Sequence, residues 1–109
     1  MKDQDRLVAF AVLMLLIPSA LAEEVDVRHR GRLSLDDFDC SAVEGSFIRR
    51  VCYDEENRYM LIQLGSVWYH YCNVPDETVT DLLEAKSASR YFNANVRGRF
   101  GCRINQVPR

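Results

Sequence analysis

The residues with the clearest chemistry are the cysteines. Their spacings along the chain are 12, 20 and 30 residues, and no two of them form a C-x-x-C pair. Structural zinc sites usually contain that close pair, so the spacing argues against a metal site. An even number of cysteines in so short a chain is typical of disulfides. We expect two disulfides, formed in one of three possible pairings among Cys40, Cys52, Cys72 and Cys102.

The histidines are the candidates for acid–base catalysis, and the chain has two, His29 and His70. A thiol beside either would be a nucleophile, but in an oxidising compartment a thiol tends to become a disulfide. No acid or hydroxyl at a known spacing completes a triad with His70. We therefore expect a structural role for His70, no enzyme activity, no cofactor and no metal.

A second group of residues could bind an anion. Tyr69 and Tyr71 stand two residues apart, which places both rings on one face of a strand. Residues 85–109 contain six basic side chains and no acidic one, and such a segment can hold an anion, a phosphate or an acidic partner. The candidate ligand-binding residues are Tyr69, Tyr71, Arg90, Asn93, Arg97 and Arg99.

Each of these candidates also has a purely structural interpretation. The tyrosines would pack under a helix, since a sheet in a small α+β domain needs one face covered. The basic segment would be a solvated surface that pairs with the acidic half of the chain, which includes Asp36, Asp37 and Glu55. The net charge of −2 disfavours non-specific binding to nucleic acid.

The N-terminus carries the pattern of an export signal. Residues 7–17 are continuously apolar, Pro18 follows, and the small residues Ala20 and Ala22 precede an expected cut before Glu23. The apolar run is shorter than the roughly 20 residues that a membrane-spanning helix needs. Residues 1–22 are therefore predicted to be a signal peptide, with an uncleaved anchor or a buried helix as the alternatives. The mature chain would be periplasmic or secreted, with no stable membrane anchor.

Strands and helices must position the candidate residues. Alternation of apolar and polar residues predicts strands over residues 47–53, 58–64 and 67–74. Pro75 opens a predicted helix, and Ser87 or Ser89 would cap a second short helix that ends near Gly98. The predicted fold class is α+β, a small three-strand antiparallel meander followed by two short helices and tied by disulfides.

The domain predicted from these elements covers residues 46–103. Before it, Val25 and Val27 alternate with acids, so residues 23–45 form either a short strand or a tethered N-terminal arm. Residues 104–109 read as a C-terminal tail.

Several short motifs follow one another in a recognisable order. They are Tyr53-Asp54, Tyr69-His70-Tyr71, Val74-Pro75, Leu82-Leu83, and Ser87-x-x-Arg90-Tyr91-Phe92-Asn93 leading to Val96-Arg97. With these motifs, the stretch from Ser46 to about Phe100 resembles the KTSC domain, a short module at the C-terminus of some lysyl-tRNA synthetases and in stand-alone bacterial proteins. With the predicted signal peptide and the four cysteines, the chain would be an exported, cysteine-containing, stand-alone member of that family. The resemblance implies little about function, since the family has no established activity, only a suggestion of RNA binding.

Cysteines replace the usual family residues at two positions. Cys52 stands where a glycine often precedes Tyr-Asp, and Cys72 stands where an aromatic residue often follows the Tyr-x-Tyr motif. If the two replaced positions meet, the resemblance implies the pairs Cys52–Cys72 and Cys40–Cys102. The outer strands of a three-strand meander lie about 10 Å apart, whereas a disulfide needs Cα atoms within about 7 Å. This pairing therefore requires the sheet to curl or the outer strands to pair.

The expected function is that of an exported binding or interaction module without catalysis. Its partner would be an envelope or extracellular protein or an anionic ligand. The alternative is RNA binding through Tyr69, Tyr71 and the basic segment Arg90–Arg103, which the net charge and the predicted export disfavour.

Overall fold

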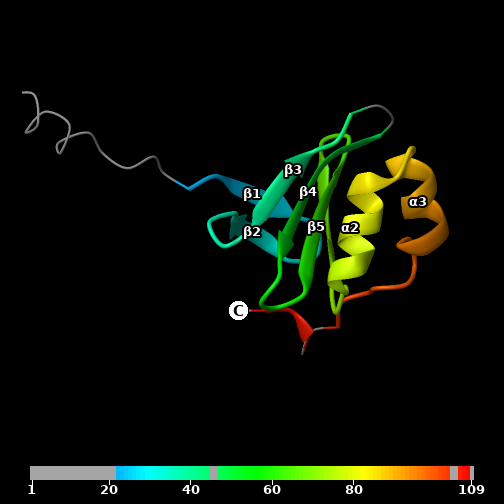
Figure 1. The fold of residues 1–109 in the computed structure, drawn as a ribbon. Helices are drawn as coiled ribbons and strands as arrows, with labels where there is room; N and C mark the ends of the chain where they lie inside the picture. The colour runs from blue at the N-terminus through cyan, green and yellow to red at the C-terminus, as the bar shows by residue number, and fades with distance from the viewer. Residues whose placement is uncertain (1–21, 45–46, 104–105, 109) are drawn as a thin grey trace, which may run out of the picture.

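The computed structural model describes residues 22–44, 47–103 and 106–108. They form one sheet with two helices packed on one of its faces (Figure 1). In chain order the elements are β1 (Glu24–Val27), β2 (Gly31–Ser34), β3 (Asp39–Ala42), β4 (Ile48–Asp54), β5 (Tyr59–Leu64), β6 (Val67–Tyr71), α2 (Asp76–Glu84) and α3 (Ala88–Asn95).

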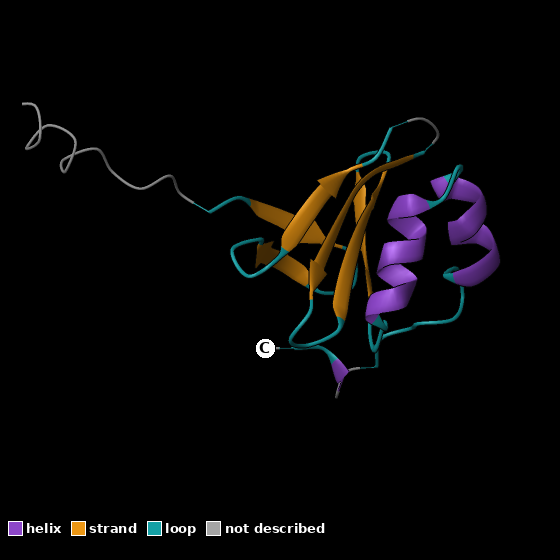
Figure 2. Cartoon of the chain, in the orientation of Figure 1, coloured by secondary structure: helices purple, strands orange, loops and turns teal. Residues whose placement is uncertain are grey.

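The six strands of the described chain lie in the order β2-β1-β6-β5-β4-β3. Neighbours are antiparallel, except that β1 runs parallel to β6 through the pair Val27 and Trp68. The edge strands β2 and β3 are consecutive in the chain, and residues 35–38 join them. A flat sheet would separate these edges by about 24 Å, whereas the connection spans at most about 17 Å. The sheet must therefore curl, as Figure 2 shows.

The predicted antiparallel β4–β5–β6 meander is confirmed. The turn between β5 and β6 places Gly65 at a φ of 60°, a backbone region that favours glycine. Glycine at the first central position is typical of a two-residue hairpin turn that matches the twist of the flanking strands. The Gly65 N–H also donates to the Phe47 carbonyl at 2.9 Å, which ties the turn to the start of β4.

Both helices begin where the sequence predicts. Pro75 is the N-cap of α2, and Asp76 and Glu77 occupy its first turn, where the helix dipole favours negative charge. Ser87 caps α3, since its hydroxyl oxygen accepts a hydrogen bond from the Arg90 backbone N–H at 3.3 Å.

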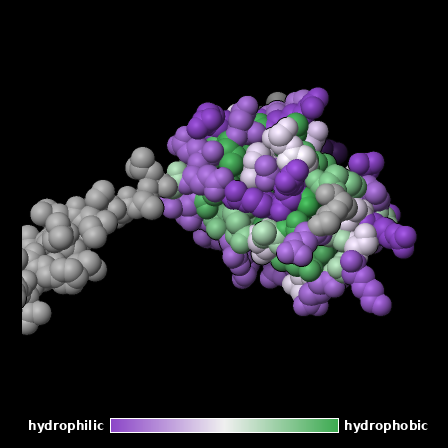
Figure 3. All heavy atoms as spheres, turned by 90° about the horizontal axis from the view of Figure 1, so that it is seen from above, coloured by the Kyte–Doolittle hydropathy of each residue, from purple (hydrophilic) through white to green (hydrophobic). Residues whose placement is uncertain are grey.

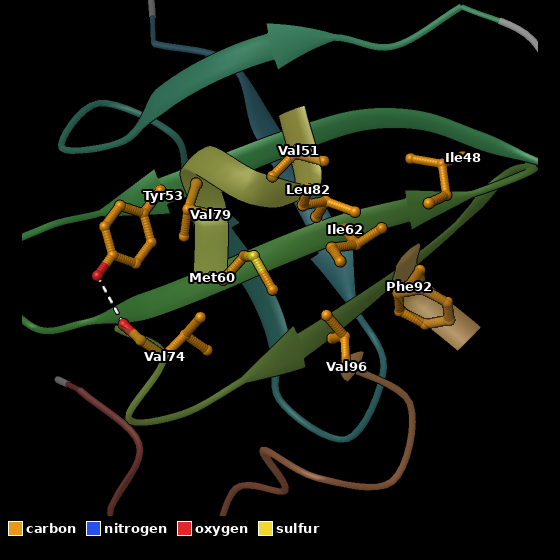
Figure 4. Close-up of a cluster of buried hydrophobic side chains, with 10 residues drawn as sticks. All are labelled: Ile48, Val51, Tyr53, Met60, Ile62, Val74, Val79, Leu82, Phe92 and Val96. Carbon is orange, nitrogen blue, oxygen red and sulfur yellow. Dashed lines mark hydrogen bonds between the residues drawn. The ribbon is translucent and has the colours of Figure 1, made fainter. Parts of the chain in front are cut away.

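Two hydrophobic cores lie on the two faces of the sheet. The helix-side core, shown in Figure 4, consists of Ile48, Val51, Tyr53, Met60, Ile62, Val74, Val79, Leu82, Phe92 and Val96. The second core fills the inside of the curl with Val25, Val27, Leu35, Cys52, Tyr59, Leu61, Trp68 and Cys72. Alternation along β6 separates them, because Tyr71 packs against the first core whereas Trp68 belongs to the second.

The expected three-strand sheet is wrong in its number of strands. Residues 23–45 supply β1, β2 and β3, which extend the sheet on both sides, so this segment is not a tethered arm. Each of these strands has four residues, and in β1 just Val25 and Val27 are buried. Such short segments carry little periodicity, and their partners are strands far along the chain, such as β6 for β1.

Some sequence predictions fall outside the described residues. They include nearly all of the predicted signal peptide, residues 1–22, and the domain boundary at residues 45 and 46. The tail at 104–109 is described at residues 106–108 alone. In the described part of the chain, no helix is both long and apolar enough to cross a membrane.

All four cysteines form disulfides, as expected, but the pairing is Cys40–Cys52 and Cys72–Cys102. The pairing implied by the family resemblance, Cys52–Cys72 with Cys40–Cys102, is therefore wrong. The physical reason is β3, which lies beside β4 and places Cys40 directly opposite Cys52, with 4.0 Å between their Cα atoms. Strand β5 lies between β6 and β4, the strand that carries Cys52. As the sequence predicts for a meander, this separation is too large for a disulfide between Cys52 and Cys72.

Candidate ligand-binding site

Tyr71 lies on the face of β6 that the helices cover. Its ring meets the buried Phe92 of α3 edge-on, with 6.0 Å between the ring centroids. Burial raises the pKa of the Tyr71 hydroxyl to about 12. Tyr71 is therefore a packing residue. The helix that covers its ring is α3, and not the helix after Pro75 that the sequence would place there.

Tyr69 lies on the same face of β6 and is half-buried. The Arg28 guanidinium lies over its ring, 5.9 Å from the centroid, a cation–π arrangement. Arg28 follows β1, and its backbone N–H donates to the Trp68 carbonyl at 2.9 Å, so the pairing of β1 with β6 positions it. The sequence gives no signal for Arg28, because that strand pairing is not local.

Arg97, just beyond α3, completes the cluster. Its guanidinium lies 5.7 Å from the centroid of the Phe92 ring, and its positive charge acts on Tyr71. The structure thus brings together three predicted candidates, Tyr69, Tyr71 and Arg97, and adds Arg28. We call these four residues the Tyr69 site. In the described part of the chain, neither arginine of the Tyr69 site forms an ion pair with a carboxylate.

The other candidates lie on the neighbouring surface of α3 and beyond it. Arg90 and Asn93 are exposed on the helix, one turn apart, and Arg99 is exposed after it. The Arg99 backbone N–H donates to the Val96 carbonyl at 3.0 Å across a turn in which Gly98 has a φ of 75°. Among the described residues no contact joins these three side chains to the tyrosines.

The site is polar as well as aromatic. Arg28 and Arg97 are exposed, whereas Tyr69 and Tyr71 are half-buried. The one face of the whole molecule that Figure 3 shows is largely covered by hydrophilic side chains, with hydrophobic ones between them in small groups. Two exposed guanidinium groups beside half-buried rings can hold a carboxylate or phosphate by charge and hydrogen bonding while an apolar part contacts the rings.

His70 points to the opposite face of β6, into a separate cluster. Its Nδ1 lies 2.7 Å from the Tyr59 hydroxyl, which also accepts a hydrogen bond from the Arg30 guanidinium at 3.3 Å. Because Arg30 donates to the Tyr59 oxygen, the Tyr59 O–H is free to donate to Nδ1, and a neutral imidazole accepts this hydrogen bond. Burial, with the charge of Arg30, lowers the pKa of His70. The arrangement ties β5 to β6 and to the β1–β2 turn.

Two further observations limit the chemistry of the described residues. Their cysteines are all bonded in disulfides, so they offer no thiol nucleophile. They also contain no group of three or more His, Cys, Asp or Glu side chains that could hold a metal ion.

Residues 44–100 match the sequence model of the KTSC domain. The chain belongs to the KTSC domain family. It is 37% identical over 59 residues to a protein of Tsukamurella paurometabola, covering 53% of this chain and 88% of that one. It is 40% identical over 53 residues to an uncharacterized protein of Stutzerimonas stutzeri, covering 48% of this chain and 75% of that one.

A solved structure shows the same fold. The crystal structure of a KTSC domain protein from Yersinia pestis superposes with a TM-score of 0.57 at 31% identity, covering 61% of this chain and 94% of that one. The KTSC match contains β4 to β6 with α2 and α3, whereas β1 to β3 precede it. Tyr69, Tyr71 and Arg97 thus belong to the KTSC domain, and Arg28 lies outside the matched residues.

Proposed function

We propose that this KTSC protein is an exported binding module without catalysis, and that its Tyr69 site holds the anionic group of a ligand or partner. The observation that carries the proposal is the placement of two arginines, Arg28 and Arg97, beside two tyrosines with no carboxylate paired to either arginine in the described chain. Two guanidinium groups that lie over aromatic rings and have no carboxylate partner among the described residues favour a carboxylate or phosphate as the ligand.

Export is supported by the signal-peptide pattern at residues 1–22 and by the two disulfides, which form and persist in oxidising compartments. An envelope or extracellular protein would then be the natural partner. Intact mass of the protein recovered from the periplasm of a Gram-negative host tests this step. A species that begins at Glu23 is expected, and one that retains residues 1–22 would contradict it.

RNA binding through Tyr69 and Tyr71 is the less favoured alternative. Single-stranded RNA is bound by stacking bases on exposed aromatic rings. Tyr71 is packed against Phe92, and Arg28 lies over the Tyr69 ring, so neither offers a fully open face.

The anion-binding proposal can be tested by NMR on the oxidised protein. Titration with inorganic phosphate should shift the side-chain N–H signals of Arg28 and Arg97, and the double variant Arg28→Gln/Arg97→Gln should weaken binding about tenfold. The matched control Arg49→Gln/Arg103→Gln removes the same charge from exposed positions elsewhere and should leave the affinity unchanged. Equal weakening in both double variants would show that net charge, and not the Tyr69 site, attracts the anion.

The same variants separate an anionic ligand from RNA. A single-stranded oligonucleotide that binds with a steep loss of affinity as salt rises, and that depends on Tyr69, would favour the RNA alternative. Flat or absent oligonucleotide binding at low salt would exclude it.

A further inference from the structure

A groove runs between β3 and α2 at the β3 edge of the sheet, away from the Tyr69 site on β6. One part is a hollow of about 190 Å³, with Ser41 of β3 on one side and Thr80 and Leu83 of α2 on the other. A second hollow of about 360 Å³ adjoins it, because Asp39 and Glu55 line both. We call the two hollows together the β3 groove.

The β3 groove combines an apolar floor with acidic walls. Val51 and Val79 are buried side chains at its base, and Leu83 is 40% exposed at its rim. Six carboxylates line the two hollows, and neither lysine nor arginine does. The six are Asp37, Asp39, Asp54, Glu55, Glu56 and Asp76. Such a groove favours a cationic group on an apolar stem.

Strand β3 also presents an open edge beside this groove. The Val43 N–H donates to the Arg49 carbonyl at 2.8 Å, and hydrogen-bonded pairs alternate along an antiparallel ladder. The backbone groups of Ser41 therefore bond to β4, whereas those of Cys40 and Ala42 point outward. Cys40 and Ala42 are exposed, and within the described residues no strand pairs with this edge. An open edge can accept a further strand.

We propose that the β3 groove binds an extended, cationic segment of a partner protein, which joins the sheet as a strand beside β3. Its backbone pairs with Cys40 and Ala42, and its alternate lysine or arginine side chains reach back over Asp39 toward Glu55. The methylene stems of these side chains pack on Leu83. A second copy of the chain is a poor occupant, because pairing two β3 edges would bring two acidic grooves together.

A labelled peptide of alternating lysine and valine is the probe, with binding followed by fluorescence anisotropy on the full, oxidised protein. The double variant Asp39→Asn/Glu55→Gln should weaken binding about tenfold. The control Asp26→Asn/Glu84→Gln makes the same change in net charge at exposed residues outside the groove and should bind as the parent does. Equal weakening by both double variants would overturn the proposal.

A second comparison tests strand addition itself. Ala42→Pro removes one outward N–H without removing a β3–β4 hydrogen bond, so it should abolish binding while the thermal transition persists. A peptide with alternate backbone nitrogens methylated tests the same bonds on the parent protein, should the proline variant fail to fold. Unchanged affinity of that peptide, or equal binding of a glutamate–valine peptide, would overturn the proposal. So would a dimer of the peptide-free protein that Ala42→Pro dissociates.

Discussion

At the scale of single residues, Tyr59 holds the inside of the curled sheet together. Its hydroxyl joins His70 and Arg30, and its ring packs against Phe38 with 6.0 Å between centroids. Burial raises the pKa of Tyr59, so the phenol remains protonated and can donate to His70. The neutral form of His70 is the one that fits this arrangement.

Acid should therefore weaken the fold through His70. Its pKa lies below the usual 6.5 in the folded protein, so the stability it contributes is present above pH 6.5 and is lost as the pH falls through the folded pKa. Urea unfolding at pH 7.5 and 5.5 should show a larger loss for the parent than for His70→Gln, which does not titrate. His29→Gln, which removes the smallest of the three causes that lower the pKa of His70, should keep most of the loss of the parent. An equal loss in His70→Gln and the parent would contradict this role.

A second buried hydroxyl joins the sheet to α2. The Tyr53 hydroxyl lies 2.6 Å from the Val74 carbonyl oxygen and 2.8 Å from Asp76 Oδ1, and the first contact is drawn in Figure 4. Tyr53→Phe should lower the free energy of unfolding by about 1–2 kcal/mol, since the buried Val74 carbonyl loses its donor. Tyr91→Phe removes a hydroxyl near the surface and should cost clearly less by denaturant titration. Equal costs would contradict the role assigned to Tyr53.

The residues of the Tyr69 site show what the sequence can and cannot predict. Tyr69, Tyr71 and Arg97 were predictable because their residue types, alternation and local charge are visible in a short window. Arg28 and the Tyr59–His70 pair were not, because a distant strand or a neighbouring hairpin strand brings them into place. Local pattern thus identifies candidate residues, whereas tertiary pairing decides which of them meet.

At the scale of elements, the predicted strands and helices after residue 46 are confirmed, whereas residues 23–45, expected to be a short strand or an arm, supply three strands. β4 to β6 have five to seven residues each, with clear alternation and short turns. β1 to β3 have four residues each and are stabilised by pairing with one another and with β4 and β6. Their existence depends on the assembled sheet and not on their own propensities.

The turn between β5 and β6 contains Gly65, and a substitution there measures how much the hairpin depends on glycine. Gly65 has a φ of 60°, so Gly65→Ala should lower the free energy of unfolding by about 1–2 kcal/mol through backbone strain. Gly101→Ala is a matched control, because Gly101 also has open space around its Cα but lacks a positive φ. Denaturant titration should show little loss for the control. Similar losses for both variants would mean that the turn does not require glycine.

At the scale of the whole molecule, each disulfide fastens a flanking segment to the KTSC domain. Cys52 and Cys72 lie inside the matched residues 44–100, whereas Cys40 precedes them and Cys102 follows them. The cysteines that replace usual family residues therefore bond to the added segments and not to each other. Closing separations of 12 and 30 residues stabilises the fold by roughly 3 and 3.5 kcal/mol in the loop-entropy model.

This arrangement predicts a specific peptide map. Trypsin cleaves between every pair of neighbouring cysteines in the sequence, so the non-reduced digest should link residues 33–49 to 51–58 and residues 59–86 to 100–103. Reduction before digestion should release all four peptides. A disulfide link between peptides 51–58 and 59–86 would instead show that Cys52 is bonded to Cys72. In that case β3 would no longer be fastened to β4 by a covalent bond, and the open edge that the β3 groove offers to a partner would lose its fixed position.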